Sequence, residues 1–551
     1  MLSLLFANPS TLAVVAVVAP LLVVAVHLVP YLSDPHNARA LPGPWLARFS
    51  DLWLGLVSKA GHRSETIHQL HLKHGPFVRI APNHVSIAHP EALQVVYAHG
   101  NGALKSDFYD AFVSIRRGIF NTRDRNEHTR KRKFVAHIFS QKSVVEFEPH
   151  IRLHIAALVN QWDRLFNLAV KGEKGTEGGG WQGRNGRLYL DCLLWANYLA
   201  FDIVGDLAFG APFGMIQAAK DIAKVPKNQS QEQAMSSYGK ASRPEDVAEV
   251  PAVKILNGRG EYSMSLGVLP ARWRPFARMI PWYRRGEKDV KTLAGIAIMA
   301  VKNRLMFDSD RVDLLAKLKN SKDSNGNYMS REEVTAEALT LLIAGSDTTS
   351  NSTCAIIYHL ASNPSIQHKL QRELDEQLGP ASDDDFALTA DQVKSLPYLD
   401  ACINEGLRIH STSSLGLPRV IPQGGLTILG THFPEGTVVS VPSYTIHRDT
   451  DTWGEDVEIY RPERFLDSES NSESESKEKQ EKIQRCFNPF SLGPRACVGR
   501  NLAFLELQMI VGSLMRRYEF VLESEGQVLE TREGFLRKPL ECVVGVRRRD
   551  V

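Results

Sequence analysis

The chain has 551 residues, of which 43% are hydrophobic, and its 65 basic and 62 acidic residues leave a net charge of +3. This length allows two or three average domains or one large one, and the near balance of charge excludes a strongly basic nucleic-acid-binding protein. The six cysteines are far apart and form no C-x-x-C pair, which favours a reducing compartment and argues against structural zinc.

The N-terminal segment is long and apolar enough to span a membrane. Residues 11–32 are almost wholly apolar, and a spanning helix needs ~20 such residues. The first basic residues, Arg39 and Arg48, follow this run, so the positive-inside rule keeps the rest of the chain on the cytosolic side. A cleaved signal peptide is the alternative, but the lack of basic residues before the run, and its length, favour an uncleaved anchor.

A proline-rich run separates this segment from the rest of the chain. The sequence Leu-Pro-Gly-Pro at residues 41–44 predicts a stiff, non-helical linker. We therefore divide the chain into a membrane anchor over residues 1–33, a hinge over residues 34–48 and one large domain over residues 49–551.

The first part of the domain mixes short strands with helices. Two β-like runs, residues 78–80 and 85–87, flank a turn signal and predict a hairpin. Residues 106–125 are irregular and aromatic. A helix is expected next, where His128 and Arg132 share one face because they are four residues apart. A solvated basic face is the alternative interpretation of this run.

Several segments look like insertions or covers. The glycine-rich residues 171–185 predict a surface loop, and the apolar residues 188–209 predict a buried helix. Polar residues 224–249 predict a mobile loop. Residues 267–283 are rich in aromatics, proline and arginine, and fit either a contact with the membrane surface or a substrate entrance. The Ser/Glu/Lys-rich residues 467–482 predict an exposed, mobile insertion.

A long helix is predicted over residues 331–362. Ser330 is a good N-cap, and Glu333 completes the pattern of a capping box. The middle of the helix carries the run Ala-Gly-Ser-Asp-Thr-Thr, residues 344–349. Gly345 costs up to ~1 kcal/mol relative to alanine in a helix, so the sequence either needs space beside the backbone or opens the helix there. A helix with a polar face is the alternative.

Two later motifs place charges where a helix and a turn can bring them together. Glu405 and Arg408 are three residues apart on a predicted helix and can pair. Arg464 follows in the run Pro-Glu-Arg-Phe. An isolated surface pair of this kind contributes little to stability, so the motifs matter only if they are buried.

The most informative stretch is Phe-Ser-Leu-Gly-Pro-Arg-Ala-Cys-Val-Gly, residues 490–499. Cys497 stands in a glycine-rich loop just before a predicted helix over residues 500–516. Backbone N–H groups at such a position lower the pKa of a thiol and make the sulfur a good metal ligand. The alternative is a buried structural cysteine.

This decapeptide resembles the haem-binding signature of the cytochrome P-450 superfamily, Phe-x-x-Gly-x-Arg-x-Cys-x-Gly, at all five fixed positions. The other motifs follow in the family's order. The resemblance implies a mainly α fold with a small β region, a triangular helical prism that holds haem b between the long helix and the cysteine loop. Residues 49–551 would then form a haem-thiolate monooxygenase domain.

The resemblance also implies roles for single residues. Cys497 would be the axial ligand of the haem iron, with Phe490 beside the haem. Gly345 would leave room for dioxygen, and Thr348 and Asp347 would deliver protons during oxygen activation. Two further groups are implied: a buried charge network behind the loop, formed by Glu405, Arg408 and Arg464, and propionate-binding side chains, His128, Arg132, Arg419 and Arg495.

A finer resemblance covers residues 74–149 and 413–425, which are similar to the fungal benzoate 4-monooxygenases. It implies insertion of one oxygen atom of O2 into benzoate to give 4-hydroxybenzoate. Because no flavin or nicotinamide motif is present, the electrons would come from NADPH through a cytochrome P-450 reductase in the endoplasmic reticulum membrane. A monooxygenase of another aromatic or lipophilic substrate, and a haem-thiolate protein that binds without turnover, remain alternatives.

An aromatic carboxylate needs donors for its charge and aromatic side chains for its ring. Within residues 106–125 the expected substrate contacts are Tyr109, Ser114, Arg116 and Phe112, with Arg117, Phe108 and Phe120 as further candidates. At least one of the two neighbouring arginines is expected to face solvent.

Overall fold

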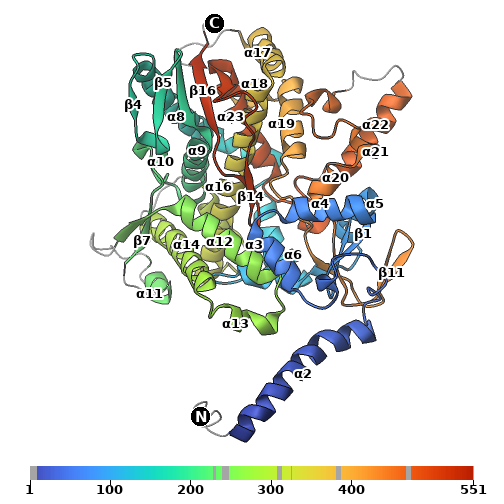
Figure 1. The fold of residues 1–551 in the computed structure, drawn as a ribbon. Helices are drawn as coiled ribbons and strands as arrows, with labels where there is room; N and C mark the ends of the chain where they lie inside the picture. Colours follow the sequence, from blue (N-terminus) through green and yellow to red (C-terminus); the bar gives the residue numbers. More distant parts are fainter. Residues whose placement is uncertain are drawn as a thin grey trace.

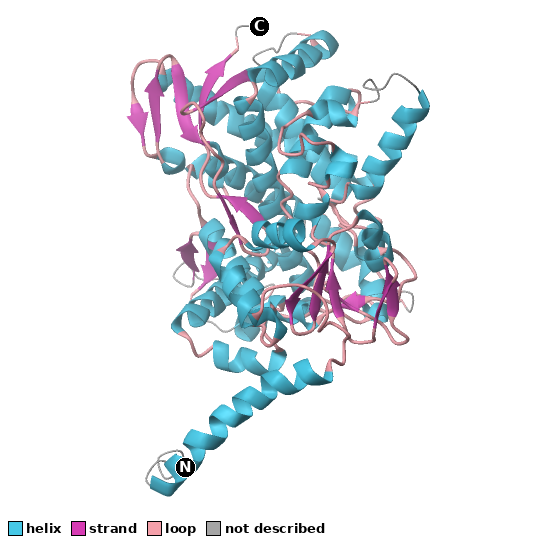
Figure 2. Cartoon of the chain, turned by 45° about the vertical axis from the view of Figure 1, so that its right-hand side comes forward, coloured by secondary structure: helices cyan, strands magenta, loops and turns pink. Residues whose placement is uncertain are grey.

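Helices make up most of the body, and two five-stranded sheets lie at opposite ends of it (Figures 1 and 2). The computed structural model describes residues 9–227, 231–236, 238, 247–306, 313–323, 326–379, 386–466 and 473–549. The helices that surround the core elements discussed below are α3 (Leu52–Ala60), α4 (Arg63–His74), α5 (Pro90–Tyr97), α6 (Arg125–Ala136), α7 (Gln141–Val144), α8 (Glu148–Ala169), α10 (Met215–Ala218), α12 (Ala252–Gly267), α14 (Pro281–Met306), α15 (Leu314–Asn320), α17 (Pro364–Leu378), α18 (Ala390–Val393), α19 (Pro397–Ile409), α20 (Ser443–Ile446) and α21 (Thr450–Trp453).

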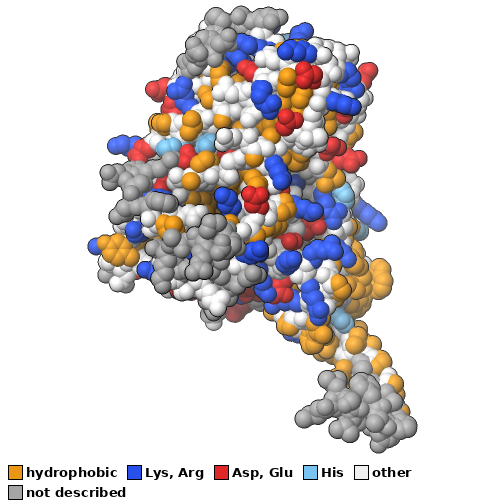
Figure 3. Space-filling view, turned by 90° about the vertical axis from the view of Figure 1, so that its left-hand side faces the viewer, with side chains coloured by type: hydrophobic (Ala, Val, Ile, Leu, Met, Phe, Trp, Pro, Cys, Tyr) orange, Lys and Arg blue, Asp and Glu red, His pale blue; other side chains and the backbone are white. Residues whose placement is uncertain are grey.

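The N-terminal helix α2 (Pro9–Ser33) projects away from the body with its hydrophobic side chains exposed (Figures 1 and 3). Its stretch Ala16–Ser33 has a mean hydropathy of 2.1 and none of it is buried, so its length and composition suit a membrane span. The helix rests on the body near its end, where His27 Nδ1 lies 2.8 Å from the Phe49 carbonyl oxygen. The predicted apolar helix is confirmed; the division into anchor, hinge and domain stays a prediction.

Three long helices form the centre of the body. The first, α9 (Cys192–Phe209), is apolar but 94% buried, which identifies it as a core helix. The second, α16 (Arg331–Ser362), packs along α9, and the third, α23 (Arg500–Arg517), packs against α16. Ser330 caps α16 by accepting a hydrogen bond from the Glu333 N–H, as expected. The predicted capping box is only half formed, because the Glu333 carboxylate pairs with the buried Lys131 instead.

The sheet next to the C-terminus includes residues that were predicted to form a surface loop and the start of a helix, so both predictions are wrong there. Its strand order is β13-β16-β6-β5-β4, with every neighbouring pair antiparallel. Residues 171–185 are therefore not simply a surface loop, and the buried helix begins at Cys192, not at residue 188. One partner of β6 is the adjacent β5, but the other, β16, lies about 350 residues later in the chain, where no local pattern can reveal it. The strands are β4 (Lys174–Gly175), β5 (Trp181–Arg184), β6 (Arg187–Asp191), β13 (Tyr518–Leu522) and β16 (Val543–Arg548).

Two predicted mobile segments contain regular structure. Within residues 224–249, strands β7 (Ala223–Pro226) and β8 (Val247–Val250) pair, and α11 (Gln231–Ser236) lies between them; the remainder falls partly outside the described residues. Within residues 467–482, helix α22 (Glu473–Cys486) begins, while residues 467–472 lie outside the described part. Ile483 and Cys486 anchor α22 because both are buried against the neighbouring core.

The sheet at the other end brings distant segments to the cavity described below. The predicted hairpin is confirmed as β1 and β2, and the order continues through β12 and β9 to β3. Lys105 on β3 is thereby paired with Arg419 on β9. The strands are β1 (Phe77–Ala81), β2 (His84–Ile87), β3 (Leu104–Lys105), β9 (Arg419–Val420) and β12 (Val438–Ser440); two hairpins, β10 (Leu426–Ile428) with β11 (Thr431–Phe433) and β14 (Thr531–Glu533) with β15 (Arg537–Pro539), complete the set.

Residues 267–283 form short helices on the surface. They comprise η6 (Ala271–Trp273), α13 (Arg274–Ala277) and the first turn of α14. Trp273, Phe276 and Met279 are exposed, with Phe276 63% exposed. The segment therefore presents apolar side chains to its surroundings, which is compatible with either of the two roles considered above.

Candidate haem-thiolate site

The loop before α23 presents Cys497 to an internal cavity. Its side chain is exposed there, and Phe490 and Arg495 line the same cavity. The Cys497 N–H donates to the Phe490 carbonyl oxygen over 2.9 Å, which closes the loop. Gly493 has a φ of +67°, and a Cβ there would lie 2.1 Å from the Tyr97 carbonyl oxygen, so only glycine fits. The turn-rich loop with an accessible sulfur is present as predicted.

The pKa of this thiol is shifted in the direction opposite to the prediction. The sulfur faces the cavity, and desolvation by the surrounding protein raises the pKa of Cys497; the Gly499 N–H and the charges of Arg132 and Arg500 only partly oppose that effect. Desolvation disfavours the thiolate more than the loop amides favour it. A metal ion would reverse the balance, because coordination deprotonates a thiol outright.

Helix α16 contributes a wall of the same cavity. Thr348 lines it, and its hydroxyl donates to the Ala344 carbonyl oxygen over 2.6 Å. Asp347 is buried and its Oδ1 lies 2.7 Å from Nζ of Lys538 on β15. The structure therefore places Thr348 at the cavity and holds Asp347 in an ion pair, and the role of both in proton delivery stays a prediction.

Gly345 has a packing reason in the structure. A Cβ at this position would lie 2.9 Å from Cγ2 of Val204 on α9. Two helices approach this closely only where one side chain is missing. The absence of a side chain at Gly345 thus serves the contact between α9 and α16, and its predicted role in leaving room for dioxygen stays a prediction.

Cations gather beside the cysteine loop without a carboxylate to balance them. Lys105, Arg419 and Arg495 line the cavity, and Arg132 donates to the Ala496 carbonyl oxygen over 2.7 Å. Among the described residues, no ion pair neutralises any of these four side chains. Burial, followed by the charges of Arg495 and Lys105, lowers the pKa of His128 to about 3. Such a cluster requires an anionic partner, since buried unpaired charge is strongly unfavourable.

The predicted charge network lies behind the loop and is buried. Arg408 forms two hydrogen bonds to the Glu405 carboxylate, at 2.7 and 2.8 Å, and Arg464 Nε lies 3.2 Å from the same group. Arg408 also donates to the His447 carbonyl oxygen. The His447 ring in turn accepts a hydrogen bond from the backbone N–H of Asn488, two residues before the signature. The network therefore reaches the loop through His447, which sequence reasoning missed.

The predicted substrate contacts divide into two groups. Tyr109, Phe112 and Ser114 line the cavity, as does Phe120. Arg116 lines its edge, is exposed, and has its Nη1 3.4 Å from the Ser330 hydroxyl. The expectation that at least one arginine faces solvent is confirmed, because Arg117 is also exposed and pairs with Asp110.

Several residues of the cavity wall had not been expected. Lys105, Arg259 on α12 and Phe535 in the β14–β15 turn all line it. None belongs to a recognisable motif, so no local signal marks them. Phe535 completes an aromatic cluster with Phe112 and Phe120, with ring centroids 4.9 to 5.7 Å apart.

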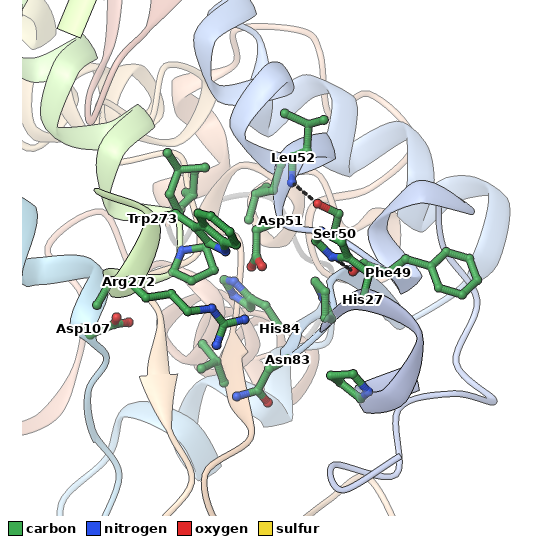
Figure 4. A pocket seen from close by; sticks show the side chains of 18 of the residues that line it. His27, Phe49, Ser50, Asp51, Leu52, Asn83, His84, Asp107, Arg272 and Trp273 are labelled. Carbon is green, nitrogen blue, oxygen red and sulfur yellow. Dashed lines mark hydrogen bonds between the residues drawn. The ribbon is translucent and has the colours of Figure 1, made fainter. Parts of the chain in front are cut away.

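A different cavity lies where α2 meets the body (Figure 4). His27, Asp51, His84 and Arg272 project into it, and Cys497 does not line it. Burial raises the pKa of Asp51 to about 6. Because it holds no candidate metal ligand of the predicted site, we assign the chemistry to the cavity of Cys497.

The residues around Cys497 fit a haem. A sulfur faces the cavity on one side, a threonine-bearing helix forms another wall, and the unbalanced cations suit two propionate groups. These features define a haem-thiolate protein, and they combine residues from five separate parts of the chain.

Comparison with known proteins agrees. The model of the family described as Cytochrome P450 matches residues 41–546, and the chain belongs to that family. It is 49% identical over 536 residues to "Benzoate 4-monooxygenase bphA" of Aspergillus niger, covering 96% of each chain. It is also 29% identical to "Cytochrome P450 monooxygenase tpeC" of Talaromyces stipitatus, over 95% of this chain and 91% of the relative.

The chain is accordingly a cytochrome P450 monooxygenase with a haem iron cofactor. Dioxygen is its co-substrate, and electrons derived from NADPH reach it through a reductase. When bound, a haem with a thiolate ligand supplies the electron density that favours cleavage of the O–O bond. The protein supplies the binding site, the orientation of the substrate and the protons.

Proposed function

We propose that the protein hydroxylates benzoate, or a closely related small aromatic carboxylate, at the para position. The observation that carries this proposal is the cluster of Phe112, Phe120 and Phe535 in the wall of the Cys497 cavity, whose rings pack edge to face. Such rings bind a flat aromatic substrate through its faces and edges. The relative at 49% identity carries the name of this activity.

The proposed roles of the other side chains follow from their positions. Cys497 is the iron ligand, Phe490 lies beside the haem, and the cations near His128 bind the propionates. Thr348 delivers protons to the reacting centre, and the ion pair of Asp347 with Lys538 connects this part of α16 to the β14–β15 hairpin. Proton delivery by positioned side chains of this kind is general acid catalysis.

The proposed setting is the membrane of the endoplasmic reticulum. Helix α2 is the anchor, residues 34–48 are the hinge, and residues 49–551 form the catalytic domain on the cytosolic side. The exposed apolar length of α2 supports an anchor. The electron donor is then a membrane-bound NADPH–cytochrome P-450 reductase in the same bilayer.

The test is reconstitution of the purified protein with reductase and NADPH in air. We expect 4-hydroxybenzoate to form from benzoate and benzoate to shift the haem spectrum from low to high spin. A fatty acid and 4-methoxybenzoate serve as comparison ligands. Turnover of the fatty acid without benzoate turnover would replace the proposed substrate, and binding of benzoate without oxygen-dependent turnover would indicate a binding protein.

A further inference from the structure

A buried cation without a counter-ion stands in the cavity wall at Arg259. Its side chain is 6% exposed, and Nη2 donates to the Phe112 carbonyl oxygen over 3.2 Å. Nε has no hydrogen-bond partner, and among the described residues no carboxylate lies within ion-pair distance. A buried guanidinium in this state is unfavourable unless an anion joins it. Burial lowers the pKa of Arg259 to about 10, so the group is still charged at neutral pH.

The nearest acidic residue does not satisfy this charge. Asp347 acts on Arg259 electrostatically, but its carboxylate is in contact with Lys538 at 2.7 Å. Lys538 therefore neutralises Asp347 and leaves Arg259 free for another anion. A planar guanidinium suits a carboxylate because it can offer two parallel N–H donors.

The other cations of the cavity differ from Arg259 in their surroundings. Lys105, Arg419 and Arg495 lie together around His128, where the propionates are expected. Arg116 is exposed to solvent, which weakens any ion pair that it forms. Arg259 lies on α12, and its hydrogen bond goes to the Phe112 carbonyl oxygen.

Arg259 also lies next to the aromatic cluster formed by Phe112, Phe120 and Phe535. Its guanidinium lies 5.2 Å from the centre of the Phe112 ring, and Phe112 packs on Phe535 and Phe120. A cation at the rim of three rings is the arrangement that an aromatic acid requires, with its ring among the phenylalanines and its carboxylate on the arginine.

We propose that Arg259 binds the carboxylate of the aromatic acid substrate and so selects acids over neutral aromatics. With its carboxylate held by Arg259, the substrate directs the opposite end of its ring toward the reaction centre, which accounts for attack at the para carbon. This inference rests on the proposed function, since it names the residue that binds the carboxylate of the proposed substrate.

The test compares benzoate with its neutral isostere benzamide on the haem-loaded protein. Spin-state titration and equilibrium dialysis give the dissociation constants for the wild type, Arg259→Gln, Arg259→Lys and Lys254→Gln. Lys254 is an exposed cation on the same helix and serves as the matched control. We expect Arg259→Gln to weaken benzoate binding by about 10- to 100-fold and to leave benzamide binding within about threefold of the wild type.

Arg259→Lys keeps the charge but loses the forked geometry, so an intermediate loss is expected. If the reduced-CO spectrum shows that Arg259→Gln takes up no haem, the same titrations of Arg259→Lys still test the proposal. Unchanged benzoate affinity in both variants, or an equal loss for benzoate and benzamide, would overturn the role of Arg259. A wild-type protein that binds benzamide but no aromatic carboxylate would overturn the proposed function together with this inference.

Discussion

At the scale of single residues, the balance of charge distinguishes the parts of the site that support the loop from those that receive ligands. The Glu405 carboxylate is buried and satisfied by Arg408 and Arg464. By contrast, Arg419 and Arg259 are buried beside the cavity without a carboxylate in ion-pair contact among the described residues. Satisfied buried charges hold a structure in one geometry, whereas unsatisfied ones create sites for anions.

We expect Glu405→Ala to abolish haem incorporation. Removal of this carboxylate leaves Arg408 and Arg464 buried without their partner, which costs roughly 3–5 kcal/mol. The measurement is the reduced-CO difference spectrum of the purified variant. Glu481→Ala is the control, because Glu481 pairs with Arg485 and both side chains are exposed, so its loss should leave the spectrum intact. A normal spectrum from Glu405→Ala would refute the structural role of the network.

Glu506 on α23 is expected to make stability depend on pH. Burial raises its pKa to about 7, opposed by the hydrogen bond from the Thr349 hydroxyl at 3.0 Å. Because the folded pKa lies above the unfolded one, stability from the protonated form is complete below about pH 4.5 and is lost as the pH rises through about 7. The melting temperature of Glu506→Gln should therefore rise relative to the wild type between about pH 5 and about pH 7 and then level off.

Thermal unfolding across that pH range checks this expectation. Glu481→Gln, an exposed position on α22, serves as the control and should track the wild type at every pH. A constant difference between Glu506→Gln and the wild type would show that folding does not shift the pKa of Glu506.

At the scale of elements, short strands recruited from distant parts of the chain build the two ends of the body. Strands β4 to β6 depend on β16 to complete their sheet, and β3 depends on β9. Such strands are only two to six residues long, so their local sequence carries little β signal. Their structure comes from pairing and from packing against helices, as the contact between β5 and the end of α8 shows.

Gly183→Ala is expected to destabilise the protein by roughly 1–3 kcal/mol. Gly183 lies on β5, where an added Cβ would approach the Ala169 carbonyl oxygen at the end of α8 to 1.8 Å. The atoms that this Cβ would meet belong to the Ala169 backbone, so the clash can be relieved only if β5 or the end of α8 moves. Gln182→Ala changes an exposed neighbour on the same strand and should be nearly neutral. Thermal unfolding with equal stability for both variants would support the surface loop that the sequence suggested.

At the scale of the whole molecule, the apolar helix α2 meets the rest of the body near its C-terminal end. Helix α2 touches the body near its end, where the rings of Tyr31 and Phe49 lie 4.6 Å apart and Arg79 lies over Tyr31. The haem cavity is built from other parts of the chain. Binding of the membrane and binding of haem are therefore expected to be separable.

Deletion of residues 2–33 is expected to move the protein from the membrane fraction to the soluble fraction and to leave the reduced-CO spectrum unchanged. The reason is that the exposed apolar side chains of α2 supply the attraction to the bilayer and line no part of the Cys497 cavity. Replacement of α2 by a different apolar span is the control and should restore membrane association. Truncated protein that stays with the membranes would point to the apolar surface around Phe276 as a second attachment.

Much of the site could be predicted from the sequence because the residues that carry its chemistry stand in short contiguous motifs. The ligand Cys497 and its glycines stand within ten residues, Thr348 stands inside a helix with clear boundaries, and Glu405 and Arg408 are one turn apart. The sequence by itself thus determined the cofactor class and the mainly helical fold, through the family resemblance of these motifs, and the apolar N-terminal helix, through local composition.

Only the tertiary structure decided what surrounds the substrate and what charge the site leaves unbalanced. Lys105, Arg259 and Phe535 come from a strand, a helix and a hairpin turn that are far apart in the chain, and no spacing relates them. The pKa of Cys497 was also predicted in the wrong direction, because desolvation depends on everything packed around the loop. Burial and pairing are properties of the folded chain, and they determine which cations hold the protein together and which are left to bind a ligand.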